Sequence, residues 1–108
     1  MPQITPTAFF KELQTAADHF ILDVRTFEEF SEGHLESAVN IPVDDLRERL
    51  SEIPRGPRVF IYCRAGYRSY LATRILLNHG WQEVRNIQGG FTLISQVMES
   101  FRLTAEKN

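Results

Sequence analysis

The sequence predicts an α/β fold in which helices cover both faces of a parallel sheet. Short apolar runs bounded by turn residues alternate with stretches of helical periodicity along the chain. Unbroken apolar runs are typical of strands that are buried on both faces of a parallel sheet. The 108 residues suffice for one core and contain no repeat, no low-complexity segment and no internal linker. We therefore expect residues 1–108 to form a single domain.

A helix and a buried strand come first in the predicted order. Thr5 is suited to cap the helix and Pro6 to occupy its first turn, and we expect this helix to end near Ala17. The apolar run 20–22 follows and predicts a strand.

An acidic and a basic residue close this strand. Asp23 and Arg25 are two positions apart, so at the end of a strand they point to the same side. We interpret them as an ion pair that holds neighbouring loops together. A direct role for Arg25 in binding substrate stays open.

A short helix and a short strand are predicted next. Thr26 and Glu29 have the Thr-x-x-Glu spacing of a capping box, and Gly33 is suited to end the helix. We interpret His34 as structural, because a loop histidine more often binds backbone groups than transfers protons. The short run 38–41, which Pro42 closes, predicts the strand.

Two longer helices flank a central strand. We expect an amphipathic helix over 43–53. Its apolar residues recur at steps of three or four positions: Val43, Leu46, Leu50 and Ile53. The run 59–62 is the central strand, which two prolines precede, and the helix after it should reach His79 and stop at Gly80.

A last strand and a last helix complete the pattern. Strand 83–87 leads through Gly89 and Gly90 into a helix, in which we expect Phe91 and Met98 to be core residues and not part of a ligand site. Two glycines at the carboxyl end of a strand indicate that backbone approaches another segment closely, and we expect that segment to be the cysteine loop.

The cysteine of the sequence lies where the central strand meets the next helix. Cys63 is followed by Arg64, Gly66 and Arg68. The first turn of a helix has N–H groups without partners, and Gly66 permits the positive φ that a loop of amides around a sulfur needs. With two arginines nearby, the thiolate should be favoured near neutral pH, which makes Cys63 a candidate nucleophile.

A lone cysteine at a strand end can also be a small buried hydrophobe. We favour a catalytic role for Cys63, because placing two guanidinium groups beside an inert thiol would not stabilise the protein. One cysteine excludes an internal disulfide and leaves no cysteine cluster for a metal, so we expect neither metal nor cofactor. It also fits a reducing compartment, and no secretory signal is visible, so we expect a cytoplasmic protein.

Charge is distributed unevenly along the chain. Residues 55–85 contain six arginines and one glutamate, a local charge of +5, whereas the remainder carries −7. This asymmetry should attract a small anion or an acidic partner to the cysteine loop. Only two lysines are present, at opposite ends, which argues against nucleic acid as a partner. No apolar run approaches the roughly 20 residues of a membrane span, so no membrane partner is expected.

Five motifs, in this order and spacing, resemble those of a single-domain rhodanese over nearly the whole chain. They are Asp23-Val24-Arg25, Gly33-His34, Asn40-Ile41-Pro42, the loop from Cys63 to Ser69, and Gly89-Gly90-Phe91. The resemblance implies a rhodanese-like sheet of five parallel strands. The stretch from Tyr67 to Leu76 is most similar to the rhodanese domain at the carboxyl end of coenzyme A disulfide reductase-like flavoproteins. The chain lacks the Gly-x-Gly-x-x-Gly nucleotide site of such a reductase.

The resemblance also implies a sulfurtransferase with Cys63 as its catalytic residue. Cys63 would take sulfane sulfur from a small anionic donor such as thiosulfate and pass it, as a persulfide, to a thiol acceptor or to cyanide. The loop amides would hold the outer sulfur, and the two arginine side chains would orient the donor. The residues assigned to substrate binding are Arg64, Ala65, Gly66, Tyr67, Arg68 and Ser69. Supporting roles are assigned to Asp23, Arg25, Gly89 and Gly90.

Other functions stay open beside a free-standing sulfurtransferase. The chain could be a persulfide-relay or binding module of a larger flavin-dependent reductase, with a redox or sulfur-carrier protein as its partner. A regulatory binding module would tolerate loss of Cys63. Phosphatases of this fold, and arsenate reductases, are rivals, but the phosphatases resemble Cys-x5-Arg. This chain reads Cys-x4-Arg, a smaller ring that suits sulfur better than phosphate.

Overall fold

The computed structural model describes residues 2–15 and 18–107, the last seven of these by their backbone. Within this part of the chain, five parallel strands form one sheet in the order β1-β5-β4-β2-β3. The strands are β1 (Gln3–Ile4), β2 (His19–Asp23), β3 (Val39–Asn40), β4 (Arg58–Tyr62) and β5 (Val84–Ile87). The α/β fold with a five-stranded parallel sheet is therefore confirmed.

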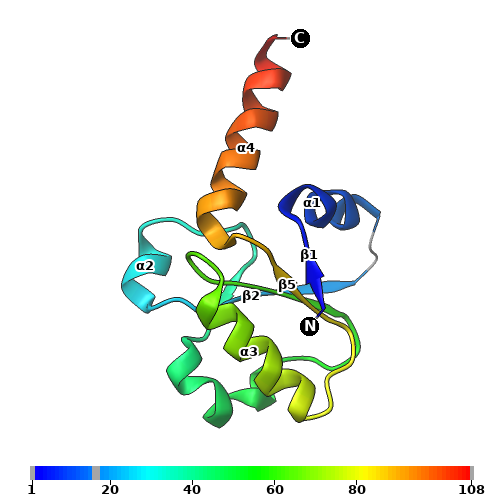
Figure 1. Cartoon of the computed structure of the whole chain (residues 1–108), viewed down its shortest axis with the longest axis vertical. Helices are drawn as coiled ribbons and strands as arrows, with labels where there is room; N and C mark the ends of the chain where they lie inside the picture. Colours follow the sequence, from blue (N-terminus) through cyan, green and yellow to red (C-terminus); the bar gives the residue numbers. More distant parts are fainter. Residues whose placement is uncertain (1, 16–17, 108) are drawn as a thin grey trace.

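Helices cover both faces of this sheet. They are α1 (Pro6–Thr15), α2 (Phe27–Ser31), α3 (Tyr67–Asn78) and α4 (Gly90–Lys107), with two 3₁₀-helices, η1 (Val43–Glu48) and η2 (Leu50–Glu52). Figure 1 shows α1 and α4 on one side of the sheet and α3 with the two 3₁₀-helices on the other. The apolar core is divided in the same way, with Phe9, Phe60 and Ile94 in one cluster and Leu46, Ile61 and Leu76 in the other.

The central strand β4 carries the candidate nucleophile at its carboxyl end. It pairs with β2 on one side and β5 on the other, and its last four residues, 59–62, are fully buried. Asp23 of β2 lies beside Tyr62, the residue before Cys63. Ligands of parallel α/β sheets bind at the carboxyl ends of strands, so the sheet order brings the Asp-Val-Arg motif and the cysteine loop to the same edge.

The strand β1 was not predicted from the residue pattern. It has two residues, and it adds to the edge of the sheet by pairing with β5. A run this short has no readable periodicity, which explains why the pattern missed it. The predicted helix end at Ala17 lies outside the described residues, and α1 is described as far as Thr15.

The capping box of α2 is confirmed. The Glu29 N–H donates to Thr26 Oγ1 at 3.2 Å, and Glu29 Oε1 accepts from the Thr26 N–H at 3.0 Å. His34 Nδ1 lies 2.9 Å from the carbonyl oxygen of Phe30, and the two rings stack with centroids 3.7 Å apart. His34 thus binds the backbone of α2, as predicted for a structural histidine.

The predicted helix over 43–53 is wrong in type, because the segment forms two 3₁₀-helices. The chain bends at Arg49, with φ −120° and ψ 20°, and this residue separates η1 from η2. Val43 and Leu46, like Leu50 and Ile53, are three positions apart, which is one turn of a 3₁₀-helix. The apolar spacing therefore fits two tight turns as well as it fits an α-helix.

The prediction that Met98 belongs to the core is also wrong. Its side chain is 44% exposed, because α4 leaves the body of the molecule as it runs toward the carboxyl end (Figure 1). Phe91, in the first turn of α4, is half-buried and stacks on Tyr62 with ring centroids 5.8 Å apart. The first turn of α4 therefore packs on the sheet.

Candidate active site

The thiol of Cys63 lies in a tight loop between β4 and α3. Its side chain is buried, with 1% of the residue exposed. The N–H of Gly66 donates to Sγ at 3.0 Å, so the loop curls back over the sulfur. Gly66 has φ +126°, a backbone conformation that residues with a side chain rarely adopt. The sequence therefore places a glycine where the loop needs one.

A hydroxyl completes the polar surroundings of the sulfur. Sγ lies 3.4 Å from Ser69 Oγ, and this oxygen donates to the carbonyl of Gly66 at 3.1 Å. Ser69 is buried in the first turn of α3, where the positive end of the helix dipole favours a thiolate. Of the ring of amides expected from the sequence, the Gly66 N–H is the one that reaches Sγ in the described residues.

The side chain of Arg68 is engaged by a residue that sequence reasoning assigned only to the capping box. Arg68 donates to the two carboxylate oxygens of Glu29 at 2.6 and 3.0 Å. These bonds raise the pKa of Arg68 and lower that of Glu29 to about 2. The predicted donor-orienting arginine is therefore already bound to a carboxylate. No local sequence signal joins positions 39 residues apart.

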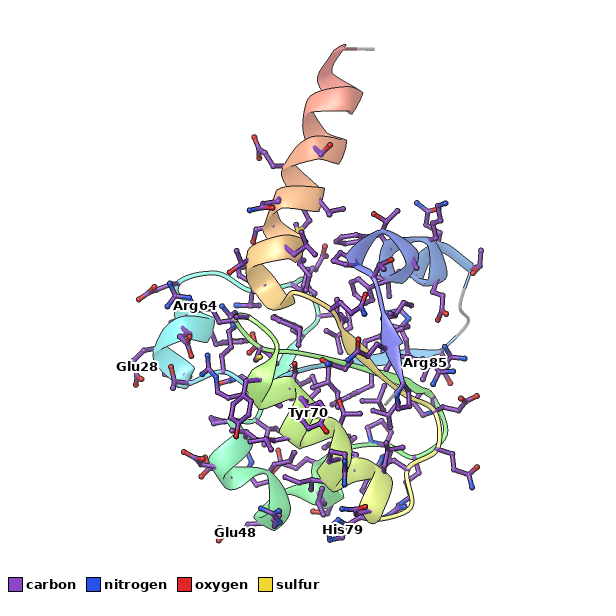
Figure 2. The ribbon with its side chains drawn as sticks, viewed as in Figure 1. Glu28, Glu48, Arg64, Tyr70, His79 and Arg85 are labelled. Atoms are coloured by element: carbon purple, nitrogen blue, oxygen red, sulfur yellow. The ribbon has the colours of Figure 1, made fainter. Side chains whose placement is uncertain are left out.

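Arg64 and Tyr67 of the same loop are exposed. Arg64 lines a shallow pocket of about 400 Å³ together with Arg25, Glu29 and Phe91. Figure 2 shows Arg64 near α2 and the start of α4. Among the described side chains, Arg64 has no carboxylate partner. Tyr67 is 74% exposed and Ala65 is also exposed, so both lie at the surface.

The predicted ion pair between Asp23 and Arg25 is confirmed. Arg25 Nη2 donates to Asp23 Oδ2 at 2.7 Å, and neither side chain is more than 5% exposed. The same nitrogen donates to the carbonyl of Gly33 at 2.7 Å, which ties the loop after α2 to the sheet edge. Burial alone would lower the pKa of Arg25. The hydrogen bonds and negative charge of Asp23 outweigh this effect, so the pKa of Arg25 is raised.

The predicted close approach of Gly89 and Gly90 to the cysteine loop is confirmed for Gly90. A Cβ atom at Gly90 would lie 2.6 Å from the carbonyl oxygen of Cys63 and 2.5 Å from that of Arg64. At Gly89, with φ +78°, a Cβ would instead meet the side chain of Leu93 at 2.6 Å. The start of α4 is therefore built against the backbone of the loop.

The described residues contain neither a helix suited to span a membrane nor a cluster suited to bind a metal ion. Among residues 2–15 and 18–107, no helix is long and apolar enough to cross a bilayer. The same residues contain no group of three or more His, Cys, Asp or Glu side chains placed to share a metal ion.

Comparisons with known proteins agree on one family. The family model described as "Rhodanese-like domain" matches residues 6–96. A protein named "Sulfurtransferase" from Allochromatium vinosum is 35% identical over 88 residues, which cover 82% of each chain. "Adenylyltransferase and sulfurtransferase UBA4" from Meyerozyma guilliermondii is 39% identical over 83 residues, and the match covers 68% of this chain and 19% of that protein.

A solved structure gives the same result. The crystal structure of reduced Bacillus anthracis CoADR-RHD superposes with a TM-score of 0.83 and 31% identity. The match covers 93% of this chain and 17% of that chain. The resemblance to the rhodanese domain of coenzyme A disulfide reductase-like flavoproteins, which the motifs predict, is therefore confirmed.

Proposed function

The chain belongs to the rhodanese-like domain family, and from this membership we propose that it is a sulfurtransferase that carries sulfur as a persulfide on Cys63. The observation that carries the proposal is the hydrogen bond from the Gly66 N–H to Sγ at 3.0 Å. This bond, at the start of α3, stabilises a negatively charged sulfur. A buried thiol without such a donor would be an inert hydrophobe.

The proposed reaction has two displacements on sulfur. In the first, the Cys63 thiolate attacks the outer sulfur of a donor such as thiosulfate, the S–S bond of the donor breaks, and sulfite leaves with the bonding electron pair. In the second, an acceptor thiolate or cyanide attacks the outer sulfur of the Cys63 persulfide, and the thiolate is regenerated. Covalent catalysis divides one transfer into two steps, and neither step needs a general base.

The proposed roles of the other residues follow from their positions. The backbone amides from Arg64 to Arg68 hold the negative charge of the outer sulfur, as preorganised donors do for developing charge in other enzymes. Ser69 is within reach of the sulfur through its hydroxyl. Asp23 and Arg25 act as positioning residues, because their ion pair ties the Gly33 loop to the edge of the sheet that holds Cys63.

A sulfur relay within a larger protein is the second candidate function. This chain matches 17% of the length of CoADR-RHD and 19% of that of the Meyerozyma protein, which combines adenylyltransferase and sulfurtransferase in its name. In those proteins the matching domain is joined to others. We propose that a redox or sulfur-carrier protein is a partner of this domain, in addition to small sulfur donors and thiols.

The intact mass of the protein tests the proposal. Wild type and Cys63→Ser are each incubated with thiosulfate and, separately, with glutathione persulfide, and then desalted. We expect wild type to gain one sulfur, about 32 Da, from at least one donor, and to lose it on addition of cyanide. Cys63→Ser should gain none. If neither protein gains sulfur from either donor, or if both gain it, the proposed function is wrong.

A further inference from the structure

We propose that Glu29 determines the donor specificity of the site, because by binding Arg68 it makes Cys63 favour thiol persulfides over doubly charged oxyanion donors such as thiosulfate. This inference rests on the proposed sulfurtransferase function and names the donor class for it. Sequence reasoning assigned Arg68 to orienting an anionic donor and gave Glu29 no part in the site.

Glu29 pairs with the Arg68 guanidinium through two hydrogen bonds. Each carboxylate oxygen accepts a bond from a different guanidinium nitrogen, at 2.6 and 3.0 Å. Such two-pronged pairs are among the strongest charge-assisted hydrogen bonds in proteins. The side chains are 30% and 23% exposed, which reduces screening by solvent. The pair leaves three of the five guanidinium N–H groups unused, but the charge of Glu29 opposes the approach of a second anion to them.

Glu29 is itself held in place from its own helix. Its Oε1 atom accepts from the Thr26 N–H at 3.0 Å and lies 3.2 Å from Thr26 Oγ1. These bonds belong to the capping box of α2, so moving the carboxylate away from Arg68 would also break the start of that helix. The pairing of Glu29 with Arg68 lowers the pKa of Glu29 to about 2, so the carboxylate stays charged at physiological pH.

Arg68 is close enough to the sulfur to matter for donor binding. Arg68 lies in the first turn of α3 between Gly66, whose N–H donates to Sγ at 3.0 Å, and Ser69, whose Oγ lies 3.4 Å from Sγ. A free guanidinium at this position would therefore attract an anionic donor toward the nucleophile. Paired with Glu29, it presents almost no net charge to the donor.

The charges that line the neighbouring pocket of about 400 Å³ do not replace Arg68. Arg25 is bound to Asp23, whereas Arg64 shares the pocket lining with Glu29 and Glu32. The pocket therefore presents about as many negative as positive charges to an incoming dianion.

Among the described residues, half of the six arginines that the sequence concentrates in residues 55–85 are paired with carboxylates. Besides Arg68, Arg58 binds Glu12 at 3.0 Å and Arg85 lies 3.8 Å from Glu83. The expectation that this stretch forms a strongly attractive surface for small anions is thus reduced by the structure.

A thiol persulfide needs none of these arginines. The Cys63 thiolate attacks the outer sulfur of R–S–SH, the donor S–S bond breaks, and the thiolate R–S⁻ leaves with the electron pair. The proton stays on the transferred sulfur, so no oxidant, reductant or base is required. The leaving sulfur atom carries a single negative charge, in contrast to the two charges on the compact sulfite ion, and loop amides can stabilise the transferred sulfur without Arg68.

Glu29→Gln tests the inference with a matched control. The glutamine keeps an oxygen that can accept from the Thr26 N–H but removes the charge that neutralises Arg68. Glu28→Gln removes the same charge from the adjacent position of α2. Glu28 is exposed, points away from the body of the molecule in Figure 2, and has no ion pair among the described residues. The readout is kcat/KM for thiosulfate and for glutathione persulfide, with cyanide or a thiol as the acceptor.

We expect wild type to favour glutathione persulfide, and Glu29→Gln to raise kcat/KM for thiosulfate about tenfold through a lower KM, an effect of about 1.4 kcal/mol. The value for glutathione persulfide should change less than threefold, and Glu28→Gln should leave the ratio of the two donors unchanged. In the double variant Glu29→Gln/Arg68→Gln the gain with thiosulfate should disappear, because the freed guanidinium is its source.

Three results would overturn the inference while the sulfurtransferase function stands. The donor ratio could stay constant in Glu29→Gln, Glu28→Gln could shift it equally, or the gain could survive in the double variant. These results can be told apart from an error in the proposed sulfurtransferase function, because in that case wild type would load no sulfur from either donor. Circular dichroism and urea unfolding show whether Glu29→Gln is folded. If it is not, Arg68→Gln alone decides, because it leaves the charge of Glu29 unpaired and should lower kcat/KM for thiosulfate relative to glutathione persulfide, whereas an unchanged donor ratio would overturn the inference.

Discussion

The N–H of Phe91 donates to the carbonyl oxygen of Cys63 at 2.7 Å, and this bond ties the first turn of α4 to the residue that carries the thiol. The N–H of Thr92 does the same for the carbonyl of Arg64 at 3.2 Å. Because β5 lies beside β4, the turn that leaves β5 arrives next to the cysteine loop. The shape of the loop therefore depends on a helix almost 30 residues further along the chain.

Gly90→Ala should distort the loop. The new Cβ would lie 2.6 Å or less from the carbonyl oxygens of Cys63 and Arg64, and φ at this position is +60°. Strain of this kind costs about 1–3 kcal/mol. We expect a loss of that size in the free energy of unfolding, measured with urea, and a slower gain of sulfur by Cys63.

Gly56→Ala is the matched control for this glycine. Nothing lies within 4 Å of a Cβ at Gly56, so the variant should be as stable as wild type and load sulfur at the same rate. If Gly90→Ala behaves like Gly56→Ala in both measurements, the contact between α4 and the loop has no energetic importance.

The buried ion pair gives a second prediction. Arg25→Met would leave the Asp23 carboxylate, which is fully buried, without its partner. Removing one member of a buried pair typically costs about 3–5 kcal/mol. Arg49→Met removes one member of an exposed pair, in which Arg49 lies 2.7 Å from Glu52, and should cost at most about 1 kcal/mol. Urea unfolding of both variants compares the costs, and equal losses would contradict the role assigned to burial.

Local residue patterns were sufficient to predict much of the fold. The capping box at Thr26, the glycine at position 66 and the run 59–62 each depend on residues close together in the sequence, and each is where the pattern placed it. The ion pair of Asp23 with Arg25 was predictable for the same reason, since alternate residues of a strand share a side.

The features that the sequence could not predict depend on distant partners or on ambiguous spacing. Glu29 and Arg68 meet only because α2 and the cysteine loop are brought to one edge of the sheet. Met98 has helical spacing like a core residue, but it is 44% exposed, and how far along α4 the packing extends depends on segments distant in the sequence. Apolar steps of three positions suit an α-helix and a 3₁₀-helix equally, which is why segment 43–53 was assigned the wrong helix type.

Ser69→Ala should weaken sulfur transfer while leaving the fold intact. The thiol donates to Ser69 Oγ at 3.4 Å while this hydroxyl donates to the carbonyl of Gly66, and once Cys63 is ionised the hydroxyl can turn to donate to Sγ, a bond that the variant loses. We expect the rate of sulfur loading to fall about tenfold, which is less than the loss of a full oxyanion-hole donor. Thr73→Val is the control, because Thr73 Oγ1 donates to the Ser69 carbonyl at 2.8 Å and not to the sulfur. Equal rates of sulfur loading in the two variants would show that the Ser69 hydroxyl has no role in the reaction.

The stability of the protein in acid should report the charge of Glu29. The hydrogen bonds from Arg68 lower the pKa of Glu29 from 4.5 to about 2. A carboxylate with a lowered pKa contributes stability that is complete above pH 4.5 and is lost as the pH falls toward 2. For a partly exposed pair this contribution is about 1 kcal/mol. The difference in free energy of unfolding between wild type and Glu29→Gln should therefore be largest near pH 6 and absent near pH 2. Urea titrations at pH 6, 4 and 2.5 measure it, and a difference independent of pH would show that the ion pair with Arg68 is not its source.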